Sequence, residues 1–167
     1  MILKDKGYFN LAKKLIDGAR KEILISQFKI DSCGVAGKSL VNQLLVTHTS
    51  KAEKGIKVKV LLDCILPLRG RSANNAFIAA WLRKRKVEVK YLARNRCQHS
   101  KILEVDGEHV VIGSHNWTVN SLSRNSEISI YLTDEETIRD IKMLYEHEYG
   151  SGISYEAGAI GAVGARQ

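Results

Sequence analysis

Segments with helical and strand patterns alternate between Phe9 and Leu92, and this order constrains the possible folds more than any other feature of the chain. Apolar residues recur at helical spacing in residues 9–19, 37–55 and 77–82. A short apolar stretch follows each one: EILISQF, IKVKVLLD and VEVKYL. Helices that connect strands predict parallel pairing with both sheet faces covered. We therefore predict an α/β fold, with a mixed, largely parallel β-sheet flanked by helices on both faces.

The pattern changes after Ser100. The stretch SKILEVDGEHVVIGS predicts a β-hairpin that turns at Asp106-Gly107, a dipeptide favoured in tight turns. SEISIYL predicts one more strand. Thr133, with Glu136 three residues later, predicts a capping box at the start of the last helix. We expect that helix to bury the apolar face formed by Ile138, Ile141, Leu144 and Tyr145.

Length and composition indicate one globular unit. The chain has 167 residues, about one domain, and its 44% hydrophobic content is normal for a globular protein. We predict one catalytic domain over residues 1–149, followed by a glycine-rich segment over 150–167 that is a flexible tail or the start of a truncated segment. No apolar run of about 18 residues and no secretory signal pattern occur, so we expect a cytoplasmic protein without stable membrane association.

The net charge of +8 favours an anionic partner, either nucleic acid or acidic lipid headgroups. The basic residues are dense between Arg83 and Lys101, ahead of a histidine at position 99. A run of this kind is also typical of a solvated helix end. The candidate nucleic-acid-binding residues are Arg83, Lys84, Arg85, Arg94 and Arg96.

Three cysteines, Cys33, Cys64 and Cys97, do not form the pattern of a disulfide framework. Two interpretations stay open: a three-cysteine metal site, or small apolar side chains near a sheet edge. The absence of a C-x-x-C pair favours the second.

A polar group of residues surrounds the predicted hairpin. His99 and Lys101 are two residues apart and would project from the same side of a strand. Asp106 has the opposite parity and lies at the turn, where it would fix the turn. The returning strand ends at Gly113-Ser114, so Ser114 and Asn116 can approach His99 and Lys101. Glu127, at the start of the next strand, can reach the same end of the sheet.

These residue types suit phosphoryl chemistry. Lys101 is a compact cation with three donors, and Ser114 and Asn116 are neutral donors, so together they could bind a phosphate. A histidine can attack phosphorus as a nucleophile, and Glu127 could hold its other ring nitrogen. No cluster of carboxylates and no His/Cys ligand spacing suggests a metal site, so we expect no cofactor and no metal.

The spacing HxK(x)4D(x)6GS, formed by His99, Lys101, Asp106, Gly113 and Ser114, resembles the signature of the phospholipase D superfamily. The following HNWT and NSLSRNSE resemble the downstream block of that superfamily, with Asn116 and Glu127 at matching positions. The resemblance covers all but the tail from Gly150. It implies a phospholipase D-like fold and a covalent phosphohistidine formed by His99. It also implies phosphate binding by Lys101 and Asn116, with Asp106 in a structural role.

That mechanism needs two histidines, and the chain has one motif. His48, His109, His115 and His147 lack the lysine partner, and we expect them to be exposed or hydrogen-bonded elsewhere. The chain resembles the small single-motif endonucleases of the superfamily, which pair two chains. We therefore expect a homodimer whose two-fold axis brings both copies of His99 to one phosphate.

Three functions follow in order of support. The first is a metal-independent phosphodiesterase that cleaves DNA or RNA, favoured by the small size, the single motif and the basic run. The second is a phospholipase or phosphatidyltransferase. The third is a non-catalytic nucleic-acid-binding module, against which the complete set of motif residues argues.

Overall fold

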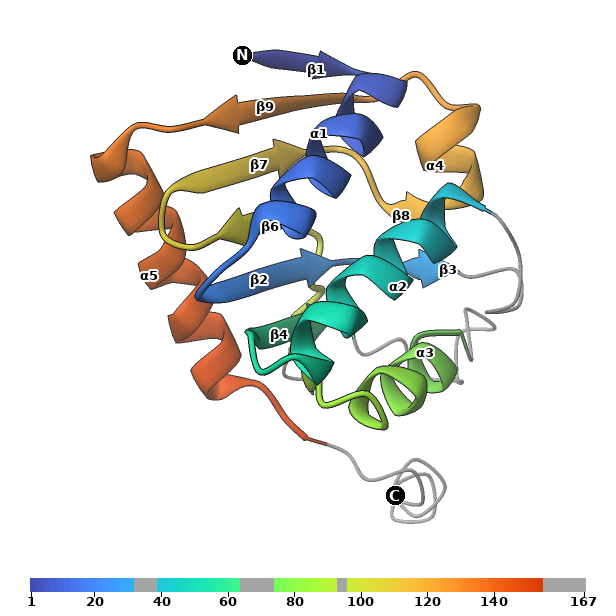
Figure 1. The fold of residues 1–167 in the computed structure, drawn as a ribbon, viewed down its shortest axis with the longest axis vertical. Coiled ribbons are helices and arrows are strands. Elements are labelled where there is room, and N and C mark those ends of the chain that lie inside the picture. The colour runs from blue at the N-terminus through green and yellow to red at the C-terminus, as the bar shows by residue number, and fades with distance from the viewer. Residues whose placement is uncertain (32–38, 64–73, 93–95, 155–167) are drawn as a thin grey trace.

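The computed structural model describes residues 1–31, 39–63, 74–92 and 96–154 (Figure 1). Its elements follow in this order: β1 (Ile2–Lys4), α1 (Lys6–Gly18), β2 (Glu22–Gln27), β3 (Ile30–Asp31), α2 (Leu40–Glu53), β4 (Lys57–Leu62), α3 (Asn74–Arg83), β5 (Glu88–Tyr91), β6 (Ile102–Val105), β7 (His109–Gly113), β8 (Trp117–Thr118), α4 (Val119–Ser123), β9 (Ile128–Leu132) and α5 (Glu135–Ser151).

Seven strands form one mixed sheet in the order β1-β9-β7-β6-β2-β4-β5, and β3 pairs with β8 in a small separate sheet. The helix–strand alternation predicts parallel pairing, and β2, β4 and β5 are parallel. The other neighbours in the sheet, β2-β6, β6-β7, β7-β9 and β9-β1, are antiparallel. The predicted class, a mixed α/β sheet flanked by helices, is confirmed. Among the described residues, two of its six pairings are parallel and four are antiparallel, and the parallel part is the side built by the helical crossovers.

The central strand β2 is buried on both faces because helices cover both sides of the sheet (Figure 1). Ile23 and Ile25 are fully buried in the cluster that contains the apolar faces of α1 and α2. Leu24, which points the other way, packs with Tyr145 and Tyr149 of α5. Full burial of one such aliphatic side chain stabilises the fold by roughly 1.5–3 kcal/mol. This two-sided core fixes the register of the strands that carry the candidate site.

The hairpin between β6 and β7 turns where the sequence predicts. Asp106 and Gly107 both have positive φ, 63° and 75°, which the Asp-Gly dipeptide tolerates. The Asp106 carboxylate accepts hydrogen bonds from the backbone N–H groups of Arg20, Lys21 and Glu22, at 2.9, 2.7 and 3.0 Å. Burial opposes ionisation of Asp106, but these three donors outweigh it and lower its pKa. The carboxylate thus ties the hairpin to the start of β2.

Two local predictions are wrong. The last helix is capped by Asp134, whose side chain accepts from Thr137 N at 2.9 Å, and not by Thr133. Leu144 is 66% exposed, and the buried face of α5 continues instead through Tyr149.

The fold continues past Tyr149, where the sequence suggests that the domain ends. Helix α5 runs to Ser151, and Ile153 exchanges two backbone hydrogen bonds with Tyr91, at 2.9 and 2.8 Å. The remainder of the predicted tail, 155–167, lies outside the described residues. None of the helices in the described part of the chain has the length and apolar character needed to cross a bilayer.

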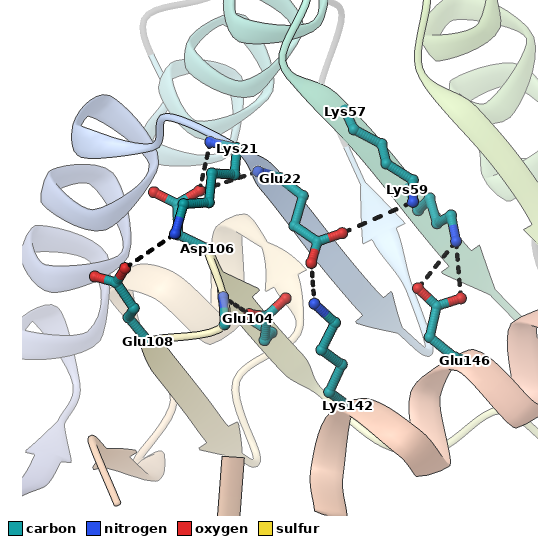
Figure 2. A network of polar contacts seen from close by, with 10 residues as sticks. Lys21, Glu22, Lys57, Lys59, Glu104, Asp106, Glu108, Lys142 and Glu146 are labelled. Carbon is teal, nitrogen blue, oxygen red and sulfur yellow. Dashed lines mark hydrogen bonds and ion pairs between the residues drawn. The ribbon is translucent and has the colours of Figure 1, made fainter. Parts of the chain in front are cut away.

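A charged network lies between the sheet and α5 (Figure 2). Glu22 binds Lys142, and Lys59 binds Glu146 at 2.8 Å. Glu104 of β6 lies beside them, 1% exposed, and Gly107 N–H donates to its Oε1. Its Oε2 is buried and has no hydrogen-bond partner among the described residues. Burial raises the pKa of Glu104 to about 7.

The cysteines divide between described and undescribed segments. Cys33 and Cys64 lie outside the described residues. Cys97 is exposed and lies in the segment just before β6. Partial burial of its thiol and the nearby Asp63 carboxylate raise its pKa.

Candidate active site

The candidate residues converge on one edge of the sheet. The parallel strands β2 and β4 end there, β6 begins there, β7 ends there and β9 begins there, as the pairings of Ser26 with Ile102 and of Gly113 with Ser129 require. His99 and Lys101 lie in an irregular segment just before β6, not within a strand as predicted. Strand parity therefore does not set their directions, and their environments differ: Lys101 is buried and His99 is exposed.

Hydrogen bonds of Gln98 fix the irregular segment that carries His99. Gln98 N donates to Asp63 Oδ1 at 2.7 Å, and its side-chain amide donates to Ser26 Oγ at 2.5 Å. Ser100 donates to Gln98 Oε1 from both its backbone N and its hydroxyl, at 3.1 and 2.8 Å. The segment is therefore anchored to the ends of β2 and β4 on both sides of His99.

Lys101 presents its ammonium group at this edge. Nζ donates to the backbone carbonyl of His99 at 2.6 Å and lies 5.4 Å from the centre of the Phe28 ring. Burial lowers the pKa of Lys101, and the nearby Cys97 and Glu127 partly offset that effect. An ammonium has three donors, so two remain for a ligand.

The His99 imidazole is exposed beside the same aromatic ring. Its centre lies 5.2 Å from that of Phe28, with the rings inclined by 55°. Within the described residues, neither ring nitrogen of His99 makes a hydrogen bond, whereas its backbone carbonyl receives Lys101 Nζ. The ring is thus oriented by its backbone and by an aromatic neighbour, with both nitrogens accessible.

The close approach of β7 to β9 brings Ser114 against Glu127. A Cβ on Gly113 would collide with the backbone of Ile128 and Ser129, so only glycine fits there. Ser114 Oγ donates to Glu127 Oε2, while Ser121 Oγ and Asn125 Nδ2 donate to Oε1 at 2.7 and 3.0 Å. Burial opposes ionisation of Glu127, but these three donors outweigh it and lower its pKa. The group is therefore a carboxylate at neutral pH.

Among the described residues of one chain, Glu127 makes no hydrogen bond to His99, whereas the sequence suggested that it could hold the second ring nitrogen. A carboxylate has about four acceptor positions, and three are occupied by Ser114, Ser121 and Asn125.

The segment HNWT alternates between the core and the site. His115 and Trp117 are fully buried: the first stacks on Tyr8 with ring centres 4.4 Å apart, and the second donates from Nε1 to Tyr8 OH at 2.8 Å. Asn116, between them, lines a polar hollow, and its buried Oδ1 has no hydrogen-bond partner. Thr118 then caps α4 by accepting from Ser121 N at 3.2 Å.

The other histidines are occupied or remote. His115 Nδ1 lies 2.7 Å from Ser129 Oγ and its Nε2 lies 3.2 Å from the Asp5 carbonyl. His48 is fully buried with Nδ1 2.8 Å from the Leu44 carbonyl, and burial lowers its pKa to about 4. His109 contacts Tyr131 OH at 3.0 Å, and His147 is exposed on α5. Among the described residues, His99 is therefore the one histidine that the fold presents at this edge.

Helices α1, α2 and α3 begin near this edge and run away from it (Figure 1). Their partially positive N-terminal ends favour an anion there. A hollow of about 330 Å³ opens beside the site. It is lined mostly by polar groups, namely Lys29, Asp31, Asn116, Thr118, Asn120 and Asn125, together with Phe28 and Val119.

The predicted basic run is not continuous with the site. Arg83 ends α3, and Lys84 and Arg85 follow it, so these three lie at the opposite edge of the sheet, before β5 carries the chain back. The Arg83 guanidinium donates to Val89 O at 2.9 Å, and that of Arg85 lies 3.9 Å from the Trp81 ring. We therefore correct the expectation that these residues lead to His99.

The remaining two residues of the run lie after β5. Arg96 lies just before the site, exposed, in an ion pair with Glu148 at 3.4 Å. Arg94 is outside the described residues.

Comparison with known proteins agrees with this geometry. Residues 12–148 match the family model described as "Cardiolipin synthase, PLD-like domain". The chain belongs to the phospholipase D superfamily. The mitochondrial cardiolipin hydrolase of Canis lupus familiaris is 30% identical over 87 residues, 52% of this chain and 32% of that protein. The chain spans between 32% and 56% of the length of the cardiolipin hydrolases considered.

Solved structures of phospholipase D-like proteins share the fold. The phospholipase D family member Nuc from Salmonella typhimurium superposes with a TM-score of 0.76 at 17% identity, over 93% of this chain and 97% of its own. NucT from Helicobacter pylori gives a TM-score of 0.72 at 20% identity, over 93% and 100%. In both comparisons the shared fold covers 93% of this chain.

Sequence reasoning missed the residues that support the motif. Gln98, Asp63 and Ser26 hold the His99 segment, and Ser121 and Asn125 hold Glu127. The only sequence signal was proximity, since Gln98 adjoins the motif and Asn125 nearly adjoins Glu127. Asp63 and Ser26 come from distant strands and carry no such signal.

Proposed function

We propose that the protein is a metal-independent phosphodiesterase that cleaves DNA or RNA through a covalent phosphohistidine, at a site shared by two chains. The observation that supports it best is a single arrangement at the sheet edge. Within the described part of the chain, an exposed histidine whose ring nitrogens make no hydrogen bond stands beside a buried ammonium that makes one. The polar hollow lined by Asn116 opens next to them.

In the proposed first step, a neutral ring nitrogen of His99 attacks the phosphorus and the bond to one ester oxygen breaks. His99 of the partner subunit, in its protonated form, gives its proton to that leaving oxygen. In the second step the same histidine takes a proton from water. The resulting hydroxide attacks phosphorus, and the bond to His99 breaks to release a phosphomonoester and restore both rings.

Lys101 and Asn116 would stabilise the charge that builds on the phosphoryl oxygens, since Lys101 Nζ has two free donors. Ser114 would act through Glu127, to which its hydroxyl already donates. The one unoccupied acceptor position of Glu127 suits a ring N–H of His99 of the partner subunit, which would keep that ring basic.

The number of available histidines supports the proposed dimer. The other described histidines are buried, hydrogen-bonded or on remote surfaces, so one chain supplies a nucleophile without an acid. A two-fold axis through the site supplies the second ring without another motif. Each dimer would then contain one composite site.

Cleavage of cardiolipin is the second candidate. It is favoured by the description of the matching family and by the names of the relatives, which include cardiolipin hydrolases and synthases. The polar lining of the hollow favours nucleic acid, because acyl chains would gain little there.

The test is a substrate panel with the purified protein. Labelled single- and double-stranded DNA and RNA, and vesicles containing cardiolipin, are incubated with and without millimolar EDTA. We expect cleavage of an oligonucleotide that persists in EDTA. Cleavage of cardiolipin alone would show that the protein acts on lipid and not on nucleic acid. Loss of activity in EDTA that magnesium or zinc restores would refute the metal-independent mechanism.

A further inference from the structure

A second hollow lies next to the candidate site, on the far side of Asn125. It encloses about 460 Å³ between the start of α1 and the end of α4, and Lys4, Lys6, Arg124 and Asn125 line it together with Asp5. Asn125 also lines the first hollow, so one side chain separates the two. The second hollow therefore continues the polar surface that begins at Asn116.

Hydrogen bonds join this hollow to the motif. Asn125 Nδ2 donates to Glu127 Oε1 at 3.0 Å, and Glu127 N donates to Asp5 Oδ1 at 3.1 Å. Glu127 in turn holds Ser114, and its charge influences the pKa of Lys101. The cations of the hollow thus stand one side chain away from the groups that would hold the scissile phosphate.

The charge of the hollow is positive and largely uncompensated. Lys4, Lys6 and Arg124 are exposed, and none forms an ion pair within the described residues. Arg124 makes one long hydrogen bond to Asn120, at 3.5 Å. The single acid, Asp5, already accepts from the Glu127 backbone. Three cations against one bonded carboxylate suit an anion and not a neutral ligand.

We propose that this hollow is a second phosphate subsite, which binds the phosphate next to the one being cleaved, with Lys6 and Arg124 as its main contacts. The inference rests on the proposed nuclease function and deepens it. Successive phosphates of a polynucleotide are joined through C3′, C4′ and C5′ of one sugar, so a ligand with one phosphate at Lys101 carries another close by. The substrate is then a strand of at least two phosphates.

The experiment compares two substrates and two double variants. K6Q/R124Q removes two of the three positive charges of the hollow and keeps polar side chains in their place. K14Q/K54Q removes two exposed charges, on α1 and at the C-terminal end of α2, and is the matched control. The substrates are a labelled oligonucleotide and bis(p-nitrophenyl) phosphate, a diester with one phosphate.

We expect K6Q/R124Q to lower kcat/KM on the oligonucleotide by about tenfold and on the single diester by less than about twofold. Its salt dependence on the oligonucleotide should become shallower by roughly one to two units of log–log slope. The control should match the wild type on both substrates.

Two outcomes overturn the subsite. K6Q/R124Q could cleave the oligonucleotide as fast as the control, or it could lose activity equally on both substrates, which would indicate a structural effect. Failure of the proposed nuclease function can be distinguished from failure of the subsite, because in that case the unsubstituted protein itself cleaves no oligonucleotide.

Discussion

Replacement of Glu104 by glutamine should change how stability depends on pH. Glu104 is 1% exposed between the sheet and α5, and one of its carboxylate oxygens has no hydrogen-bond partner (Figure 2). Burial raises its pKa to about 7, although Gly107 N–H and Lys142 act in the opposite direction. In the unfolded chain the same group titrates near 4.5. The folded state therefore binds this proton more tightly than the unfolded state.

The sign follows from that difference. Below about pH 4.5 both states are protonated and Glu104 costs nothing. As the pH rises toward about 7 the unfolded chain ionises first, so the free energy of unfolding falls, and above pH 7 the full cost remains. The difference between a pKa near 4.5 and one of about 7 corresponds to about 3 kcal/mol, most of which develops between about pH 5 and about pH 8.

The assay is urea unfolding of the wild type and E104Q at several pH values in that window. The difference in unfolding free energy, variant minus wild type, should grow by about 2 to 3 kcal/mol from about pH 5 to about pH 8. Glutamine keeps an oxygen that can accept from Gly107 N–H. If burial of its amide lowers the free energy of unfolding, that effect is the same at every pH and does not change the pH dependence. Glu108 is exposed on the same hairpin, so E108Q serves as the control and should give a flat difference. A flat difference for E104Q would refute the reasoning.

Three further predictions concern the motif. H99A should lose several orders of magnitude in rate, and its urea midpoint should be unchanged because the ring is exposed. K101A should also be severely slowed, because the charge stabilisation by its ammonium is lost. An H99A rate within about tenfold of wild type would exclude His99 as the nucleophile. D106N should lower the free energy of unfolding by about 2 kcal/mol, measured by urea unfolding, with little effect on the rate per folded molecule, because its carboxylate binds three backbone N–H groups. Wild-type and H99N chains, unfolded and refolded together in equal amounts, should show about a quarter of the activity of the same total of wild-type chains, whereas about half would mean that each chain works alone.

Local patterns in the sequence predicted most of the elements and the position of the hairpin. Phe9, Ala12, Leu15 and Ile16 are buried on α1 at the predicted spacing, and Asp106-Gly107 turns where expected. Such features depend on neighbours a few residues apart. Strand β1 was missed because three residues carry no recognisable period, and its pairing with β9 joins opposite ends of the chain.

Exposure of individual side chains was predicted less well. The apolar spacing in residues 77–82 includes Phe77, yet Phe77 is 62% exposed, while Ile78 and Leu82 are buried. Which residues of an amphipathic helix touch the sheet depends on the rotation of the helix, which tertiary packing sets.

In the candidate site too, local features could be predicted from the sequence and contacts between distant segments could not. The motif residues could be named from their spacing, but the direction of Lys101 and the partners of Glu127 depend on contacts between distant segments. The basic run shows the limit most clearly. Arg83 and Arg96 are close in sequence, but β5 lies between them, and a four-residue strand spans roughly 13 Å from one sheet edge toward the other.

The central claim is that His99 becomes covalently attached to the substrate phosphate. The most direct measurement mixes the protein with an oligonucleotide labelled on the phosphoryl side of the cleavage point, quenches the reaction in alkaline denaturant, and separates the protein on a denaturing gel. Alkali preserves a phosphorus–nitrogen bond, whereas acid hydrolyses it. We predict a labelled protein band that forms within one turnover, disappears on acid treatment and is absent from H99A. A band that H99A retains, or a wild-type protein that cleaves the oligonucleotide without becoming labelled, would contradict the account.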